Sequence, residues 1–280
     1  TYIGSVELVD NVEYIFNEET NSIQSKQINV IPGLYKLFDE GIVNCRDHCI
    51  RMKQASLEDS TNTHRVTKID VCVSEDGEIS FNNDGNGIDV AKHPEYNVWI
   101  PELIFGHLRT GTNYNKDEKK IVGGKNGFGV KLIYIWSTEG TLETIDHKRG
   151  LKYKQTFTSN LDVIGEPVIS KSKAKPYTKI TFKPDYKRLG IDTITPDIIQ
   201  LFKKRVYDIA AITDKSVKVS WNSSVVPVKE FQDYIGLYIG KNERAHEQPI
   251  DRWEYVVALT NTGEYNQVSF VNGIYTAKGG

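Results

Sequence analysis

A glycine-rich segment over residues 123–131 constrains the fold more than any other part of the sequence; it reads GGKNGFGVK. Four of its first seven residues are glycines, and the apolar residues that follow predict a buried helix. Glycine lets a backbone approach a ligand closely, and a helix N-terminus presents unpaired N–H groups to a phosphate. The spacing fits neither GxxxxGK[ST] nor GxGxxG. Taken alone, the segment leaves a phosphate site and a tight turn both open.

The composition is that of an ordinary soluble protein, with 39% hydrophobic and 26% charged residues among 280. This length suits one large domain or two smaller ones. A net charge of -2 argues against a surface that coats nucleic acid, although a local basic patch stays compatible with it. Three cysteines form no even disulfide framework and indicate a reducing compartment. We expect no membrane partner, because no apolar run reaches the roughly 18 residues of a membrane span.

Helical and strand patterns alternate along the chain and predict an α+β fold, with a mixed or antiparallel sheet covered on one face by helices. Helices are expected over 34–53, 101–108, 196–212 and 230–237, and strands over 65–73, 78–81, 141–145, 152–158, 178–182, 217–221 and 225–228.

The polar stretch 240–248 is the predicted boundary between a domain over residues 1–240 and a second unit over 241–280. In that second unit we expect strands over 253–259 and 267–271 to pair as a hairpin. The chain begins without Met and stops soon after a strand-like run, so we expect it to be a fragment of a longer polypeptide.

The helix over 34–53 has two chemically different faces. At about 100° per residue, one face is apolar and the opposite face carries Glu40, Asn44, Asp47 and Arg51. Such a polar face is normally only solvated. However, Glu40 and Asn44 one turn apart would place a carboxylate beside an amide oxygen. The carboxylate could polarise a water, and the amide oxygen suits Mg²⁺.

Two further segments are ambiguous by themselves. Residues 82–88 (NNDGNGI) follow a strand and read as an Asx turn, or as a site where Asp84 accepts a hydrogen bond from an exocyclic amine. In the second case the neighbouring glycines would let a base come close. The polar stretch 109–125 is long enough for a lid, and its Gly111, Thr112 and Asn113 suit either a plain loop or a ribose and phosphate contact.

The order of these four elements resembles the Bergerat-type ATP site of the GHKL family, which includes gyrases, Hsp90, histidine kinases and MutL. Several segments narrow the resemblance to the N-terminal ATPase region of eukaryotic-type DNA topoisomerase II, over the whole of residues 1–280. These segments are Thr1–Ser5, Pro32–Glu40, Pro101–Gly106, Asp117–Lys120, Gly123–Leu132 and Ser269–Gly273.

The resemblance implies an α+β Bergerat (GHKL) ATP-binding sandwich followed by the start of a transducer domain. It implies that Glu40 is the general base for water, that Asn44 coordinates Mg²⁺ and contacts phosphate, and that Asp84 reads the adenine amine. The ribose and phosphate contacts would be Gly111, Thr112 and Asn113. The residues that wrap the triphosphate would be Gly124, Lys125, Asn126, Gly127, Phe128, Gly129, Val130 and Lys131.

For function, the resemblance implies an ATP-binding and ATP-hydrolysing N-gate fragment of a type II DNA topoisomerase. The intact enzyme would pass one DNA duplex through a transient double-strand break in another, as a homodimer, and so relax, decatenate and unknot DNA. A nuclear setting is expected, with a large DNA virus, and hence the host cytoplasm or virion, as the alternative. Two other functions stay open: an Hsp90- or MutL-like ATPase, and a non-catalytic nucleotide-binding DNA clamp.

Overall fold

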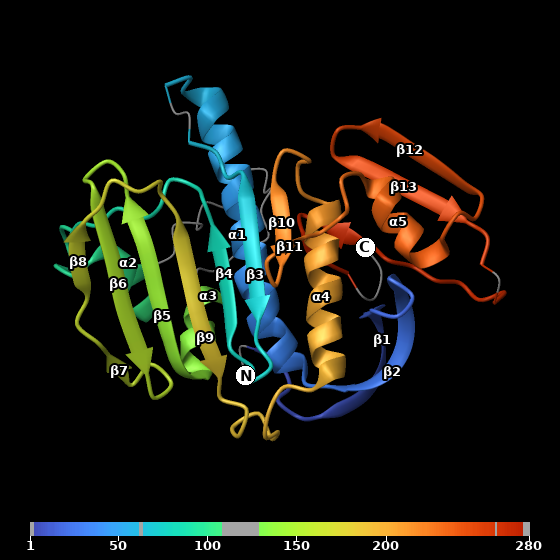
Figure 1. Cartoon of the computed structure of the whole chain (residues 1–280), viewed down its shortest axis with the longest axis horizontal. Helices are drawn as coiled ribbons and strands as arrows, with labels where there is room; N and C mark the ends of the chain where they lie inside the picture. The colour runs from blue at the N-terminus through green and yellow to red at the C-terminus, as the bar shows by residue number, and fades with distance from the viewer. Residues whose placement is uncertain (1–2, 62–63, 108–128, 261, 277–280) are drawn as a thin grey trace.

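The computed structural model describes residues 3–61, 64–107, 129–260 and 262–276 (Figure 1). The helices are α1 (Pro32–Glu58), α2 (Ile100–Gly106), α3 (Gly129–Ile135), α4 (Pro196–Ala211) and α5 (Phe231–Ile239). The strands are β1 (Val9–Asn17), β2 (Ser22–Val30), β3 (Lys68–Val73), β4 (Ile79–Asn83), β5 (Ser137–Asp146), β6 (Leu151–Thr158), β7 (Val163–Ile164), β8 (Val168–Lys171), β9 (Thr178–Pro184), β10 (Lys218–Trp221), β11 (Ser224–Val225), β12 (Arg244–Ile250), β13 (Trp253–Ala258), β14 (Phe270–Val271) and β15 (Ile274–Tyr275).

A nine-stranded sheet forms the centre of the molecule, in the order β11-β10-β3-β4-β9-β5-β6-β7, with β8 paired to β6. It is a mixed sheet, because β10 runs parallel to β3 whereas the other described pairs are antiparallel. Figure 1 shows α1, α2 and α3 behind the strands, so these helices cover one face of the sheet. The predicted α+β architecture is confirmed.

The hydrophobic core lies between the sheet and the helices. Along β6 the side chains alternate, with Tyr153 and Phe157 buried and Lys154 exposed, as expected of a strand with one face on the core. Helix α1 lies at the middle of this layer. Its Phe38 is fully buried and stacks on Phe202 of α4 with the ring centroids 4.1 Å apart. The core therefore fixes α1 between the sheet and α4.

Helix α1 is longer than the sequence predicts, since it runs over Pro32–Glu58 rather than 34–53. Proline at the first helical position has the backbone angle that a helix needs and lacks an N–H that would otherwise have no partner. The interpretation of the polar face as solvated is wrong at Asp47, which is 1% exposed. Helical periodicity does not reveal this burial, because α1 is covered on more than one side.

The predicted organisation after residue 240 needs two corrections. Strand β12 occupies most of the predicted linker and pairs with β13, and β14 pairs with β15, so the expected pairing of 253–259 with 267–271 is wrong. Nearly every residue of β12 is exposed. Such a strand needs no alternation of apolar and polar residues, so its sequence gives no strand signal.

The sequence patterns also do not predict the long β1–β2 hairpin. Among the described residues, no helix combines the length and apolar character needed to cross a membrane.

Candidate functional site

A pocket of about 200 Å³ opens between α1 and the middle strands of the sheet. Most of its wall comes from α1, β4, β9 and the loop after β4, and it combines apolar side chains with a few polar groups, as small-molecule sites do. Its lining consists of Gly41, Asn44, Cys45, His48, Arg51, Phe81, Asn83, Gly87, Ile88, Ile104, Phe105, Val130, Thr178 and Ile180.

Glu40 and Asn44 stand one turn apart on α1, as predicted. The Glu40 carboxylate pairs with Lys36 Nζ at 2.7 Å, and its side chain is 20% exposed. The amide nitrogen of Asn44 donates to the backbone oxygen of Glu40 at 2.6 Å, so Asn44 Oδ1 is not used in this contact, and Asn44 lines the pocket. The backbone of Gly129 comes so close to Glu40 that a Cβ there would lie 1.7 Å from Oε2. The start of α3 therefore meets the Glu40 carboxylate.

Asp84, which is expected to read the adenine, is not among the residues that line the pocket. Its carboxylate accepts hydrogen bonds from the backbone N–H groups of Thr67 (2.7 Å) and Lys68 (2.9 Å) and from the Thr67 hydroxyl, so it fastens the start of β3. The residue that lines the pocket is Asn83, which is 8% exposed. Strand β4 extends to Asn83, two residues beyond its predicted end, and a shift along a strand by one residue moves a side chain to the opposite face.

The loop after β4 is held against the end of β5. Gly87 has φ +71°, and a Cβ at this position would lie 1.9 Å from the Ile145 carbonyl oxygen, so glycine is required here. The next residue, Ile88, donates its N–H to Thr144 Oγ1 at 3.0 Å, and Val90 donates to Asp146 Oδ2 at 2.9 Å. These contacts place Gly87 and Ile88 in the pocket wall.

The inner wall of the pocket carries a neutral imidazole, a thiol and an amide beside one cation, Arg51. Burial, with a smaller contribution from Arg51, lowers the pKa of His48 to about 4, so its imidazole is neutral at pH 7. Burial raises the pKa of the Cys45 thiol to about 12. The amide nitrogen of Asn83 donates to that thiol sulfur at 3.7 Å, so Asn83 Oδ1 is not part of this contact. The imidazole, the thiol and the Asn83 amide suit a neutral heterocycle with a donor group at this end of the pocket.

The remaining predicted site residues fall into two groups. Val130 lines the pocket from α3, whereas Lys131, on the same helix, is 1% exposed, and burial lowers its pKa. The predicted contacts Gly111, Thr112, Asn113, Gly124, Lys125, Asn126, Gly127 and Phe128 lie outside the described residues.

Sequence reasoning missed Asn83, His48 and Thr178 as pocket residues. Thr178 begins a predicted strand, but only the pairing of Asn83 with Thr178 across β4 and β9 brings it to the site. The signal for Asn83 is present in the sequence, because it is the second of two consecutive asparagines at the end of an apolar strand.

No protein-family model matches the chain. Among curated proteins, it is 44% identical over 291 residues to DNA topoisomerase 2 of Acanthamoeba polyphaga mimivirus, an alignment that covers 100% of this chain and 22% of that protein. It is 43% identical over 290 residues to DNA topoisomerase 2 of Arabidopsis thaliana, covering 100% of this chain and 19% of the relative. The chain thus spans about a fifth of the length of the curated relatives it matches.

Solved structures give the same result. The ATPase region of Saccharomyces cerevisiae topoisomerase II bound to ICRF-187 is 39% identical with a TM-score of 0.88, and the alignment covers 99% of this chain and 71% of that one. The ATPase and transducer domains of DNA topoisomerase II from Balamuthia mandrillaris are 36% identical with a TM-score of 0.87, covering 98% and 68%. The fold, with its pocket between α1 and the sheet, is therefore that of a topoisomerase-type ATPase region. The chain belongs to the DNA topoisomerase II family.

Proposed function

We propose that this chain binds ATP in the pocket beside α1 and hydrolyses it. The observation that carries the proposal is the arrangement on α1, where Asn44 lines the pocket and the Glu40 carboxylate stands one turn before it, against the start of α3. The similarity to topoisomerase II ATPase regions supports the same function. A base fits the end of the pocket that Cys45 and Asn83 line, and the triphosphate extends toward Glu40 and the start of α3.

Asn83, rather than Asp84, is our candidate for reading the adenine. Its Oδ1 has a second lone pair available for the exocyclic amine, while its Nδ2 is occupied by Cys45. Replacing Asn83 by Ala should weaken ATP binding by about tenfold, within the range for a buried polar contact. Asp84→Asn is the matched control, since it changes the neighbouring side chain outside the pocket. A larger loss of affinity in Asp84→Asn than in Asn83→Ala, measured with a fluorescent ATP analogue, would reverse the assignment.

Glu40 acts as the general base in this proposal. Its carboxylate takes a proton from a water whose oxygen attacks the γ-phosphorus, while the bond between that phosphorus and the β–γ bridging oxygen breaks and ADP leaves. Lys36 at 2.7 Å holds the carboxylate in place from the exposed side. Because Gly129 has no side chain, the backbone at the start of α3 can lie close to the same carboxylate.

Asn44 is our candidate for the magnesium ligand from the protein. Its Oδ1 is a hard oxygen donor in the pocket wall. Among the described residues, no group of three or more His, Cys, Asp or Glu side chains could hold a metal. This fits Mg²⁺, which proteins commonly hold through one or two side chains together with substrate phosphates. The bound ion would neutralise charge on the phosphates, and Lys131 and the predicted 124–131 contacts would add to that.

The test is Glu40→Gln, which keeps the shape of the side chain and removes its basicity. We expect ATP turnover to fall by about 100-fold or more, with nucleotide affinity kept within about threefold. Glu139→Gln, at an exposed position of β5, is the control and should turn over ATP normally. Unchanged turnover in Glu40→Gln contradicts the assigned base. A wild-type chain that binds ATP without hydrolysing it would favour the non-catalytic clamp.

We further infer that the intact protein is a type II topoisomerase that acts on double-stranded DNA as a homodimer. The names of its relatives support this reading over an Hsp90- or MutL-like one, and they fit a nuclear or a viral setting. Residues 1–240 would be the ATPase domain, and residues 241–280 would begin the transducer. The test is decatenation of linked DNA circles by the full-length protein, which should require ATP and stop with Glu40→Gln.

A further inference from the structure

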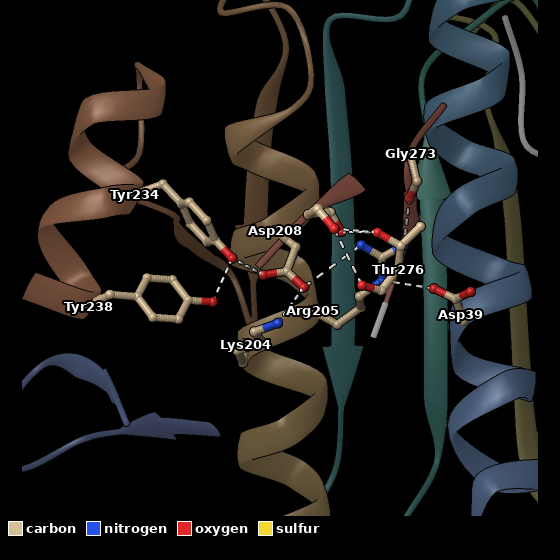
Figure 2. A network of polar contacts seen from close by, with 9 residues as sticks. Asp39, Lys204, Arg205, Asp208, Tyr234, Tyr238, Gly273 and Thr276 are labelled. Atoms are coloured by element: carbon tan, nitrogen blue, oxygen red, sulfur yellow. Dashed lines mark hydrogen bonds and ion pairs between the residues drawn. The ribbon is translucent and has the colours of Figure 1, made fainter. Parts of the chain in front are cut away.

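A buried polar cluster lies on the α4 side of α1. We define it as Asp39, Lys204, Arg205, Asp208, Tyr234 and Tyr238 (Figure 2). Arg205 and Asp208 are both 0% exposed, and Lys204 is 3% exposed. Burial of charges is costly unless each finds a partner, and here two cations face two carboxylates. Asp39 of this cluster directly precedes Glu40, the proposed general base, so the cluster is placed to influence that residue.

Arg205 connects three segments that are far apart in the sequence. Its Nε donates to Asp39 Oδ1 on α1 at 2.7 Å, and its Nη2 donates to the backbone oxygen of Gly273 at 2.6 Å. Its Nη1 has Asp208 Oδ2 at 3.8 Å and no hydrogen bond among the described groups. Figure 2 shows the guanidinium between α1 and the turn that carries Gly273. The side chain thus bridges α1 and the β14–β15 hairpin.

The other end of the cluster holds Arg205 from the α4 side. Asp208 accepts hydrogen bonds from Lys204 Nζ at 2.9 Å and from the Tyr234 hydroxyl at 2.6 Å, and Tyr238 bonds that hydroxyl in turn. Both carboxylate oxygens of Asp208 therefore accept hydrogen bonds from side chains of α4 and α5. The hydrogen bonds of Arg205 to Asp39 and to Gly273 reach beyond these two helices, to α1 and to the β14–β15 hairpin.

The β14–β15 hairpin rests against α1 at a second point. A Cβ on Gly273 would lie 2.7 Å from Arg46 Nη1, so the turn is in close contact with α1 two helical turns after Asp39. Phe270 also packs edge-on against Tyr234, with ring centroids 6.2 Å apart. A displacement of this hairpin would therefore reach α1 directly and through Arg205.

We propose that Arg205 is a positioning residue that sets the Glu40 carboxylate by fastening the adjacent Asp39 to the β14–β15 hairpin. The proposal rests on the proposed ATPase function. Asp39 and Glu40 are consecutive on one rigid helix, so a shift of Asp39 moves Glu40 with it. Misplacement of a reacting group by about 1 Å can cost on the order of 100-fold in rate. The segment after residue 240 thereby influences hydrolysis through a side chain that does not line the ATP pocket.

The test is Arg205→Lys in the chain as it stands. A lysine keeps a positive charge beside Asp39, but its single ammonium cannot reproduce the fork that reaches both Asp39 and the Gly273 carbonyl. We expect kcat for ATP to fall about tenfold, with KM and nucleotide affinity within about twofold. Hydrogen exchange of a peptide covering residues 37–45 should speed up in the same variant. An unchanged kcat overturns the proposal.

Tyr238→Phe is the matched control, because it removes a half-buried hydrogen bond between Tyr238 and Tyr234, at the end of the cluster that lies away from Asp39. Its kcat should equal that of the wild type. An equal loss of kcat in both variants would mean general loosening and would overturn the positioning role. If Arg205→Lys does not melt cooperatively, Asp39→Asn takes its place and should show the same fall in kcat. Failure of the proposed function is recognised separately, by a wild-type chain whose turnover does not depend on Glu40.

Discussion

Asp39 and Glu40 are neighbours in the sequence and face two different regions of the molecule. The Asp39 side chain is 11% exposed and pairs with a fully buried Arg205, whereas Glu40 is 20% exposed and pairs with a Lys36 that is 44% exposed. Successive residues of a helix point about 100° apart, so one helix can serve a buried cluster and a pocket at once. Two carboxylates on one helix therefore have different roles, because one faces the buried cluster and the other faces the pocket side.

The two regions also differ in charge. The α4 side of α1 is filled with paired ions, while the pocket side presents amides, a neutral imidazole, a thiol and one cation, Arg51. Paired buried ions fix a geometry, because removing one partner leaves an uncompensated charge. A mostly neutral wall tolerates entry and exit of a ligand. Variants on each side should therefore fail in different ways.

The largest expected effect is on the buried side. Arg205→Met leaves the buried Asp39 carboxylate without its cation and should lower the free energy of unfolding by about 3–5 kcal/mol. Arg188→Met is the control, since Arg188 lies at the surface over the Trp136 ring and should cost about 1 kcal/mol or less. Denaturant unfolding at neutral pH measures both. A similar small loss in the two variants would mean that the cluster does not fix the fold.

A pH-dependent effect is expected on the pocket side. Unfolded His48 takes up a proton below about pH 6.5, whereas in the folded chain its pKa is about 4. Stability is thus full above pH 6.5 and falls as the pH drops toward 4, with a loss of about 2 kcal/mol by pH 5 from this group. In His48→Gln the difference between unfolding free energies at pH 7 and pH 5 should shrink by that amount. His64→Gln, on a neighbouring surface, serves as the control, and an equal change there would contradict the assignment.

The smallest expected effect concerns the exposed pair. Lys36→Ala should lower the free energy of unfolding by about 0.5 kcal/mol, because an exposed i,i+4 pair gains little over water. Added salt should reduce this difference further, since it screens exposed charges. Thermal melts at low and high salt provide the measurement. A loss near that of Arg205→Met would show that the two regions are not as different as the exposures indicate.

The sequence predicts best what is local. The pairing of Glu40 with Asn44 follows from helical spacing alone, and β6 and β9 follow from alternation, because both signals lie within a few residues. Local patterns do not separate Asn83, which lines the pocket, from Asp84, which does not, because strand ends have no sharp signal and β4 continues to Asn83. The contact between Arg205 and Asp39 joins residues 166 positions apart, so no local pattern reveals it. The predicted contacts within 108–128 stay predictions.

The parallel pairing of β10 with β3 has a consequence for how the chain folds during synthesis. Lys68 pairs with Lys218, so about 150 further residues must be synthesised before β10 can cover the edge of β3 with which it pairs. At about 5–20 residues per second, that edge stays open for roughly 10–30 s on the ribosome. An open edge strand is a template for wrong pairing with other chains. The nascent chain should therefore depend on chaperones over this interval, and it should aggregate when synthesis pauses between β9 and β10.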